Sequence, residues 1–475
     1  RDSTLVRVSR QRFEGLTRTE PAVMRAVAGG LAVRLQNSRP IGPPSSTTPK
    51  VISVVGVDPG APTDRVGRLI EAALGQSLRV ARLGLTPPEG LQQAEADNDR
   101  VVLVAGPGGE WADACLRQAD RVVLVASDPS AVAVPGLPVP CDVVLAGSVP
   151  TTAQIVDWHD RCGCRRLYLL GVDPDAWAAR LRPLVARLAG ESVALVLAGG
   201  GARSLAHLGV LHALEAEGVT VDRVAGTSMG AYVASLYATG ANAADVDDRV
   251  FEEFVRRNPF GDYRPSLTSL ARGERGTAML RRCFGDTRLE ELERELVVVS
   301  TDLYERVPVY HRRGLTTEVV AASMSLPVLF APRRLDGRVL VDGTLTDNCP
   351  TEPFCELFEG PVVAVRIGSA SSRASAIRTP SLGETLMRIM QMGDRRDGLD
   401  GSRSATVTVT PDTRGVGLLE FHQIDRAREA GRQAGEAAVA ALAALAEHRS
   451  RGARGSRSAV ATGQEVSGLG DGSGH

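Results

Sequence analysis

The chain has 475 residues, and 43% of them are hydrophobic. A chain of this length is too long for a single hydrophobic core, so we expect two or three domains. Its 55 Lys and Arg residues nearly balance 56 Asp and Glu residues, and the net charge of −1 excludes the overall basic field that favours nucleic acid as a partner. The seven cysteines show neither zinc-binding nor thioredoxin spacing, and no apolar run reaches the ~18 residues of a membrane span, so we expect a cytoplasmic protein that touches membranes only peripherally.

The first 36 residues read as a strand over Thr4 to Val8 followed by two helices. They resemble the closing strand and last helices of a cyclic-nucleotide-binding domain, and a plain helical arm is the alternative. The phosphate cassette of that family would lie upstream, so a cyclic nucleotide would bind only through a module missing from this chain. The start at Arg1, without methionine, leads us to expect a piece of a longer protein. Residues 37–50 contain four prolines and predict a linker.

Residues 51–190 alternate short, β-branched strands with helices, which predicts a smaller, doubly wound, Rossmann-like α/β domain. The expected strands are Val51–Val57, Leu78–Arg82, Val101–Ala105, Arg121–Ala126, Asp142–Leu145 and Arg166–Leu170. The loop from Gly56 to Thr63 lies where a phosphate-binding loop would lie, but it lacks the Gly-Lys-Ser/Thr of that motif. We therefore interpret the domain as a degenerate nucleotide-binding scaffold without ATPase activity.

Two strand–turn–helix units follow each other between Ser192 and Ala238. In the second unit, residues 226–230 read Gly-Thr-Ser-Met-Gly directly after a short strand, which is the pattern of a nucleophile elbow with Ser228 at its apex. Gly226 and Gly230 are expected there because the turn is too tight for a Cβ atom on either side. The helix that follows directs its free N–H groups and its positive dipole end toward Ser228.

The first unit ends its strand, Val193 to Ala198, in three glycines. Backbone N–H groups in this loop would hold the oxyanion of a tetrahedral intermediate, and two loops of one crossover unit lie at the same sheet edge. The candidate residues of this oxyanion hole are Gly199, Gly200, Gly201, Ala202 and Arg203. The Arg203 side chain has three open interpretations: stiffening the loop, meeting a lipid phosphate, or forming a surface salt bridge.

A serine hydroxyl needs a base to take its proton. His311 is followed directly by two arginines, Arg312 and Arg313, and His422 follows an exposed-looking segment. Neither setting is typical of a catalytic histidine, so the sequence does not support a catalytic triad. Asp342 is the better candidate, because it ends the apolar strand Arg338–Val341 and precedes Gly343; a plain turn is the alternative. His207 and His212 do not share one helix face, so we expect neither a metal site nor a cofactor.

From Val193 to Val439 the sequence resembles the patatin-like phospholipases and, within them, the neuropathy target esterase-like serine esterases. The motifs that carry the resemblance are Gly199–Arg203, Gly226–Gly230, Phe284–Thr287, Thr301–Leu303, Ala322–Pro327 with Phe330 and Pro332, and Asp342–Gly343 with Asn348 and Pro350. The resemblance implies a patatin-like, three-layer α/β/α hydrolase domain over residues 191–448. It also implies a Ser–Asp dyad of Ser228 as nucleophile and Asp342 as general base, with Gly343 and Asn348 in support.

Two positions depart from the family pattern. Ser204 stands where the glycine loop usually has a further glycine, and we expect its hydroxyl to cap the following helix. Thr344 stands where the aspartate motif usually has glycine or alanine, and we expect it to alter the rate or the shape of the pocket. Beyond a final helix from Arg426 to Glu447, the Gly/Ser/Arg-rich residues 449–475 predict a disordered tail.

These features predict a serine esterase that hydrolyses acyl esters of lysophospholipids or phospholipids through an acyl-enzyme intermediate. A lipid transacylase would use the same dyad, and a regulatory or scaffold protein with weak activity is a further alternative. A dinucleotide-binding oxidoreductase is disfavoured. Gly199, Gly201 and Asp222 imitate its fingerprint, but Ser204 replaces the last glycine and Asp222 begins a strand where the fingerprint needs one to end.

Overall fold

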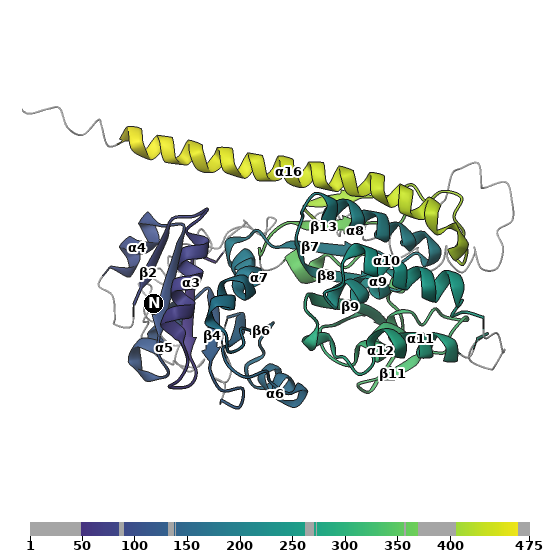
Figure 1. Cartoon of the computed structure of the whole chain (residues 1–475), viewed down its shortest axis with the longest axis horizontal. Helices are drawn as coiled ribbons and strands as arrows, with labels where there is room; N and C mark the ends of the chain where they lie inside the picture. Colours follow the sequence, from purple (N-terminus) through teal and green to yellow (C-terminus); the bar gives the residue numbers. More distant parts are fainter. Residues whose placement is uncertain are drawn as a thin grey trace, which may run out of the picture.

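The computed structural model describes residues 49–84, 90–131, 137, 139–261, 270–271, 273–355, 358–368 and 405–463. The predicted cyclic-nucleotide-binding remnant (1–36), all but the last two residues of the predicted linker (37–50), and residues 464–475 lie outside these ranges. Figure 1 shows two α/β units side by side, with a long helix, α16 (Ile424–Gly463), lying along both.

The first unit is a parallel sheet of six strands in the order β2-β3-β1-β4-β5-β6. Its strands are β1 (Val51–Gly56), β2 (Val80–Leu83), β3 (Arg100–Ala105), β4 (Arg121–Ala126), β5 (Cys141–Leu145) and β6 (Leu167–Leu169), and its helices are α3 (Thr63–Leu74), α4 (Leu91–Asp97), α5 (Gly109–Gln118), α6 (Thr152–Cys162) and α7 (Trp177–Ala189). Every predicted strand is present, with ends moved by at most two residues. The doubly wound prediction is confirmed, because alternate side chains of β1 enter separate cores on the two faces.

The second unit has the sheet order β11-β12-β9-β8-β7-β13-β14, with β10 paired to β9. Its strands are β7 (Val193–Leu197), β8 (Val221–Thr227), β9 (Glu295–Asp302), β10 (Pro308–His311), β11 (Arg333–Leu335), β12 (Arg338–Asp342), β13 (Val362–Val365) and β14 (Val407–Val409). Besides α16, its helices are α8 (Ala206–Ala216), α9 (Met229–Ala238), α10 (Ala243–Val250), the π-helical η3 (Phe251–Arg256), α11 (Glu274–Phe284), α12 (Thr316–Ser323) and α13 (Glu352–Cys355). The large core lies between one sheet face and the helices α8, α9, α10, η3, α11, α12 and α16. A smaller core around Phe354 of α13 covers the other face, as expected of a layered α/β domain.

The strand register brings two distant parts of this sheet together. Thr227, the last residue of β8, pairs in parallel with Val299 of β9. On the other side of β9, Asp342 of the antiparallel strand β12 pairs with Ser300. The residue after Thr227 is Ser228, so the serine and Asp342 meet across β9 at Val299 and Ser300, although 114 residues separate them in the chain.

The final helix is longer than predicted. Helix α16 continues to Gly463, beyond the predicted helix end at Glu447, and so includes residues 449–463 of the predicted tail. This segment contains Ala and Arg, which have high helix propensity, and no proline, so a helix that has already begun propagates through it. Among the helices that the structure describes, none combines the length and apolar character that crossing a bilayer requires.

A buried cluster of charges joins the two sheets at the end opposite Ser228. The carboxylate of Glu359 accepts hydrogen bonds from Arg121 of β4 at 2.7 Å, from Arg187 of α7 at 2.8 Å and from Arg223 of β8 at 3.2 Å. All four side chains are at most 4% exposed. Burial opposes ionisation of Glu359, but the guanidinium groups outweigh it and hold its pKa below the usual value.

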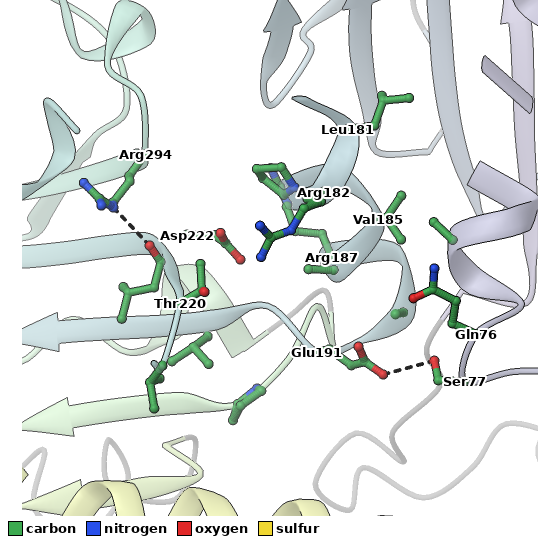
Figure 2. A pocket seen from close by; sticks show the side chains of 18 of the residues that line it. Gln76, Ser77, Leu181, Arg182, Val185, Arg187, Glu191, Thr220, Asp222 and Arg294 are labelled. Carbon is green, nitrogen blue, oxygen red and sulfur yellow. Dashed lines mark hydrogen bonds between the residues drawn. The ribbon is translucent and has the colours of Figure 1, made fainter. Parts of the chain in front are cut away.

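A cavity of about 1410 Å³ lies along the same seam, between α7, the first strands of the second sheet and the apolar side of α16. Figure 2 shows Arg187 and Asp222 facing it, with Glu191 bonded to Ser77 across the seam. Neither Ser228 nor Asp342 lines this cavity. It therefore belongs to the junction of the two units and is separate from the candidate catalytic residues.

Candidate active site

Ser228 occupies the turn between β8 and α9 in a strained backbone conformation. Its φ is +56°, a region that non-glycine residues rarely adopt. A Cβ atom on Gly226 would lie 2.5 Å from the carbonyl oxygen of Gly230, and one on Gly230 would lie 2.1 Å from that of Leu197. Both neighbours must therefore be glycine, and the turn presents the Ser228 hydroxyl at the edge of the sheet, as the elbow pattern predicts.

The hydroxyl of Ser228 donates a 2.6 Å hydrogen bond to Oδ2 of Asp342. The Asp342 side chain is fully buried. Burial raises its pKa above the ordinary aspartate value, and the hydrogen bonds from Ser228 and Thr344 oppose that rise. A desolvated carboxylate within hydrogen-bond distance of a serine hydroxyl is a general base positioned to take its proton.

Thr344 binds the other oxygen of the same carboxylate. Its backbone N–H donates to Asp342 Oδ1 at 2.9 Å and its hydroxyl donates to the same atom at 2.6 Å. Sequence reasoning noticed this departure from the family pattern but assigned it only to rate or pocket shape. In the structure, Thr344 both lines the pocket and contacts the candidate base directly.

Ser323 is a contact that sequence reasoning missed. Its hydroxyl accepts the backbone N–H of Ser228 at 2.9 Å and donates to the carbonyl oxygen of Val299 at 2.5 Å. It thereby ties the strained turn to the middle strand β9. The only signal in the sequence was its place in the motif Ala322–Pro327, which says nothing about what the hydroxyl binds.

The glycine loop offers fewer free N–H groups than predicted. The N–H of Gly199 donates to Asn348 Oδ1 at 3.0 Å, and that of Ala202 donates to the carbonyl oxygen of Leu418 at 2.7 Å. The N–H groups of Gly199 and Ala202 are therefore already satisfied and are not free to receive an oxyanion in this structure. The N–H groups of Gly200 and Gly201 have no acceptor among the described residues, and both glycines line the pocket that contains Ser228.

Other predicted support residues act on this loop. Asn348 binds Gly199 and makes no hydrogen bond to Asp342 in the described part of the chain, so it supports the loop more directly than the dyad. Gly343 is required by space, because a Cβ there would lie 2.4 Å from the carbonyl oxygen of Val299. The strand ends that carry Ser228 and Asp342 can approach each other only with glycine at this position.

Ser204 does not cap the helix, contrary to the prediction. Its buried hydroxyl donates to the carbonyl oxygen of Ala198 at 3.1 Å, and Nε2 of His207 donates to the same oxygen at 2.7 Å. Burial lowers the pKa of His207 to about 4, so the ring is neutral. Together the two side chains hold the carbonyl group at which the glycine loop begins.

Arg203, His311 and His422 lie outside the pocket. Arg203 is buried and donates a hydrogen bond to the carbonyl oxygen of Gly368 at 3.3 Å. This contact agrees with the stiffening role, and the buried position disagrees with a surface salt bridge. His311 is buried against the Ser300 hydroxyl at 2.7 Å, and His422 is exposed. Among the described residues, no group of three His, Cys, Asp or Glu side chains is placed to hold a metal ion.

The pocket around Ser228 has apolar walls. They are formed mainly by Phe260, Met324, Leu326, Leu329, Phe330, Leu418, Leu419 and Phe421. The ring of Phe260 lies 5.7 Å from that of Phe330 and 5.4 Å from that of Phe421, measured between centroids. The chemistry of these walls suits a hydrocarbon chain, which needs no hydrogen-bond partners, and the enclosed volume of about 40 Å³ means that the walls must move apart to admit one.

Comparison with known proteins places this site in context. The family model for patatin-like phospholipases matches residues 195–355. An uncharacterised NTE family protein of Mycobacterium tuberculosis is 30% identical over 483 residues, covering 92% of this chain and 80% of that protein. Lysophospholipase NTE1 of Candida glabrata is 35% identical over 191 residues, covering 39% of this chain and 11% of its own length. Among solved structures, VipD from Legionella pneumophila matches 53% of this chain and 66% of its own at 16% identity and a TM-score of 0.32, too low to support a conclusion.

Proposed function

Because this chain belongs to the NTE family of patatin-like phospholipases, we propose that it hydrolyses acyl esters of lysophospholipids or phospholipids, with Ser228 as nucleophile and Asp342 as general base. The observation that carries the proposal is the 2.6 Å hydrogen bond from the Ser228 hydroxyl to Asp342 Oδ2 in an apolar pocket. The names of the fungal relatives, which are lysophospholipases, support the choice of substrate class.

In the first half of the proposed reaction, Ser228 Oγ attacks the ester carbonyl carbon while its proton passes to Asp342 Oδ2. The carbonyl oxygen becomes negatively charged, and the N–H groups of Gly200 and Gly201 are the candidates to receive it. When the tetrahedral intermediate collapses, the bond to the leaving alcohol breaks. Asp342 returns the proton to that alcohol, and the acyl group remains on Ser228.

In the second half, water takes the place of the alcohol. Asp342 accepts a proton from water as its oxygen attacks the acyl carbon, and the same proton is then delivered to Ser228 Oγ as the fatty acid leaves. The apolar walls hold the acyl chain next to Ser228 in both halves. The buried position of Asp342 supports this double use, because a desolvated carboxylate binds a proton more readily than an exposed one.

A fluorophosphonate probe and two ester substrates test this proposal together. We expect the probe to label Ser228 alone, as located by peptide mass spectrometry, and the Ser228→Ala variant to remain unlabelled. We also expect fatty acid release from lysophosphatidylcholine and p-nitrophenol release from p-nitrophenyl butyrate. A folded chain that takes no label at Ser228 and cleaves neither ester would refute the assignment.

Removing the Thr344 hydroxyl should shift the pH profile. In Thr344→Ala, the Asp342 carboxylate loses a hydrogen bond that stabilises its ionised form, so its pKa rises further. The base acts only when it is ionised, so the acidic limb of log kcat/KM should move to higher pH by about one pH unit. This is the size expected when a hydrogen bond to a charged group is lost. Thr344→Ser keeps the hydroxyl and should leave the limb in place. A limb that does not move in Thr344→Ala contradicts this role.

A further inference from the structure

Large apolar side chains exposed on the second unit all lie on segments at the carboxyl ends of its parallel strands or at the mouth of the pocket. Within the described part of residues 191–448 they are Leu270, Leu303, Tyr304, Val307, Val328 and Leu419. Single exposed apolar residues need no explanation, but a group that shares one edge of the sheet with the pocket does. We call these six residues the apolar rim.

One segment connects the pocket to this rim. Leu326, Leu329 and Phe330 line the pocket, while Val328 in the same segment is 51% exposed. Val328 has a φ of +72°, which is unfavourable for a β-branched residue. Its carbonyl oxygen accepts the N–H of Leu270, another rim residue, at 2.9 Å. A strained backbone that directs a valine into solvent beside a catalytic pocket suggests a function for the exposed side chain.

The turn between β9 and β10 forms the other part of the rim. Strand β9 continues three residues past Val299, the partner of Thr227, so the turn stands roughly 10 Å beyond the level of Ser228. Asp302 Oδ1 accepts the N–H groups of Tyr304 at 3.0 Å and Glu305 at 3.1 Å, and its backbone N–H donates to Val307 at 3.0 Å. The turn is therefore held rigidly, with Tyr304 75% exposed at its tip.

We propose that the apolar rim docks onto the surface of a lipid bilayer or micelle and delivers single lipid molecules to Ser228. The inference rests on the proposed function, because it supplies the route by which an aggregated substrate reaches the pocket. Leu419, which both lines the pocket and is 43% exposed, makes the apolar path from surface to site continuous. Aliphatic and tyrosine side chains are suited to the boundary between lipid and water.

The test compares Tyr304→Ser/Val328→Asn with its parent, both in the full-length chain. Asn tolerates a positive φ, so this change relieves strain and should not impair folding. In the Ser228→Ala background, where no lipid is consumed, co-sedimentation with phosphatidylcholine vesicles should weaken at least tenfold. With Ser228 present, the ratio of activity on lysophosphatidylcholine micelles to activity on dissolved p-nitrophenyl butyrate should fall at least fivefold.

Val149→Ser/Val172→Ser is the matched control, because it removes two apolar side chains that are 79% exposed on the first unit. It should leave both measurements as in the parent. Two results would contradict the proposed docking surface. One is vesicle binding that is equal in the rim variant and its parent. The other is a parent that self-associates but binds no vesicles, with the self-association lost in the rim variant. Because binding is measured with Ser228→Ala, these results are independent of whether the chain hydrolyses esters.

Discussion

Replacing Asp342 by Asn should lower kcat/KM for p-nitrophenyl butyrate by roughly 10³-fold or more, as loss of an essential general base does. The two donors of Thr344 point at Oδ1 of residue 342, so the amide oxygen of Asn would be held on that side. Its NH₂ group would then face Ser228 Oγ, where the structure has an acceptor. The variant should fold, but residue 342 would offer a donor and no acceptor to Ser228, so no group could receive the serine proton.

A double-variant cycle makes this prediction sharper. If Ser228 and Asp342 act as one unit, Ser228→Ala alone, Asp342→Asn alone and the two together should reduce kcat/KM to a similar floor. The measurement is initial rates on p-nitrophenyl butyrate, with circular dichroism to establish that each variant is folded. An Asp342→Asn protein that retains a tenth of the parent's activity would exclude this residue as the base. Effects that multiply in the double variant would show that the two residues act independently.

Glu359→Ala should lower the free energy of unfolding by about 3–5 kcal/mol, the range measured when one partner of a buried ion pair is removed. Three guanidinium groups, from Arg121, Arg187 and Arg223, would lose the anion that they share between the two sheets. Removing the carboxylate leaves their positive charges buried, and the loss is felt by both units at once. We therefore expect one cooperative unfolding transition in the parent, and in the variant a transition whose midpoint lies at a lower urea concentration.

The pH dependence gives a second measure of the same cluster. The folded state depresses the pKa of Glu359, so its stabilising contribution is present above the ordinary glutamate pKa and is lost as the pH falls below that value. Stability of the parent should therefore fall on acidification more steeply than stability of Glu359→Ala. Glu429→Ala, which removes an exposed ion pair to Arg432 on α16, should leave the urea midpoint unchanged. A Glu359→Ala protein as stable as this control would contradict the role of the cluster.

Local sequence patterns were sufficient for the strands of the first unit and for the nucleophile elbow, whereas β9, β10, β11, β13 and β14 of the second unit were not predicted. Short, continuous β-branched runs identified the parallel strands of the first unit, because the strands of a parallel sheet are buried on both faces and need apolar side chains at every position. Gly226 and Gly230 identified the elbow, since the turn excludes a Cβ atom at either position. Asp342 was recognised from a strand ending in Asp-Gly and from the family motif. These features depend on residues within about one turn of each other, and neighbours in sequence carry that information.

Contacts between distant segments decided the remainder. Leu418 removes the Ala202 N–H from the oxyanion hole, the Thr344 hydroxyl turns out to bind the candidate base, and Glu359 meets Arg121 across 238 residues. Which donor finds which acceptor depends on strand order and register, and these follow from the packing of the whole core. A hydroxyl such as that of Ser204 has several acceptors within reach along the chain, and only the folded arrangement selects one of them.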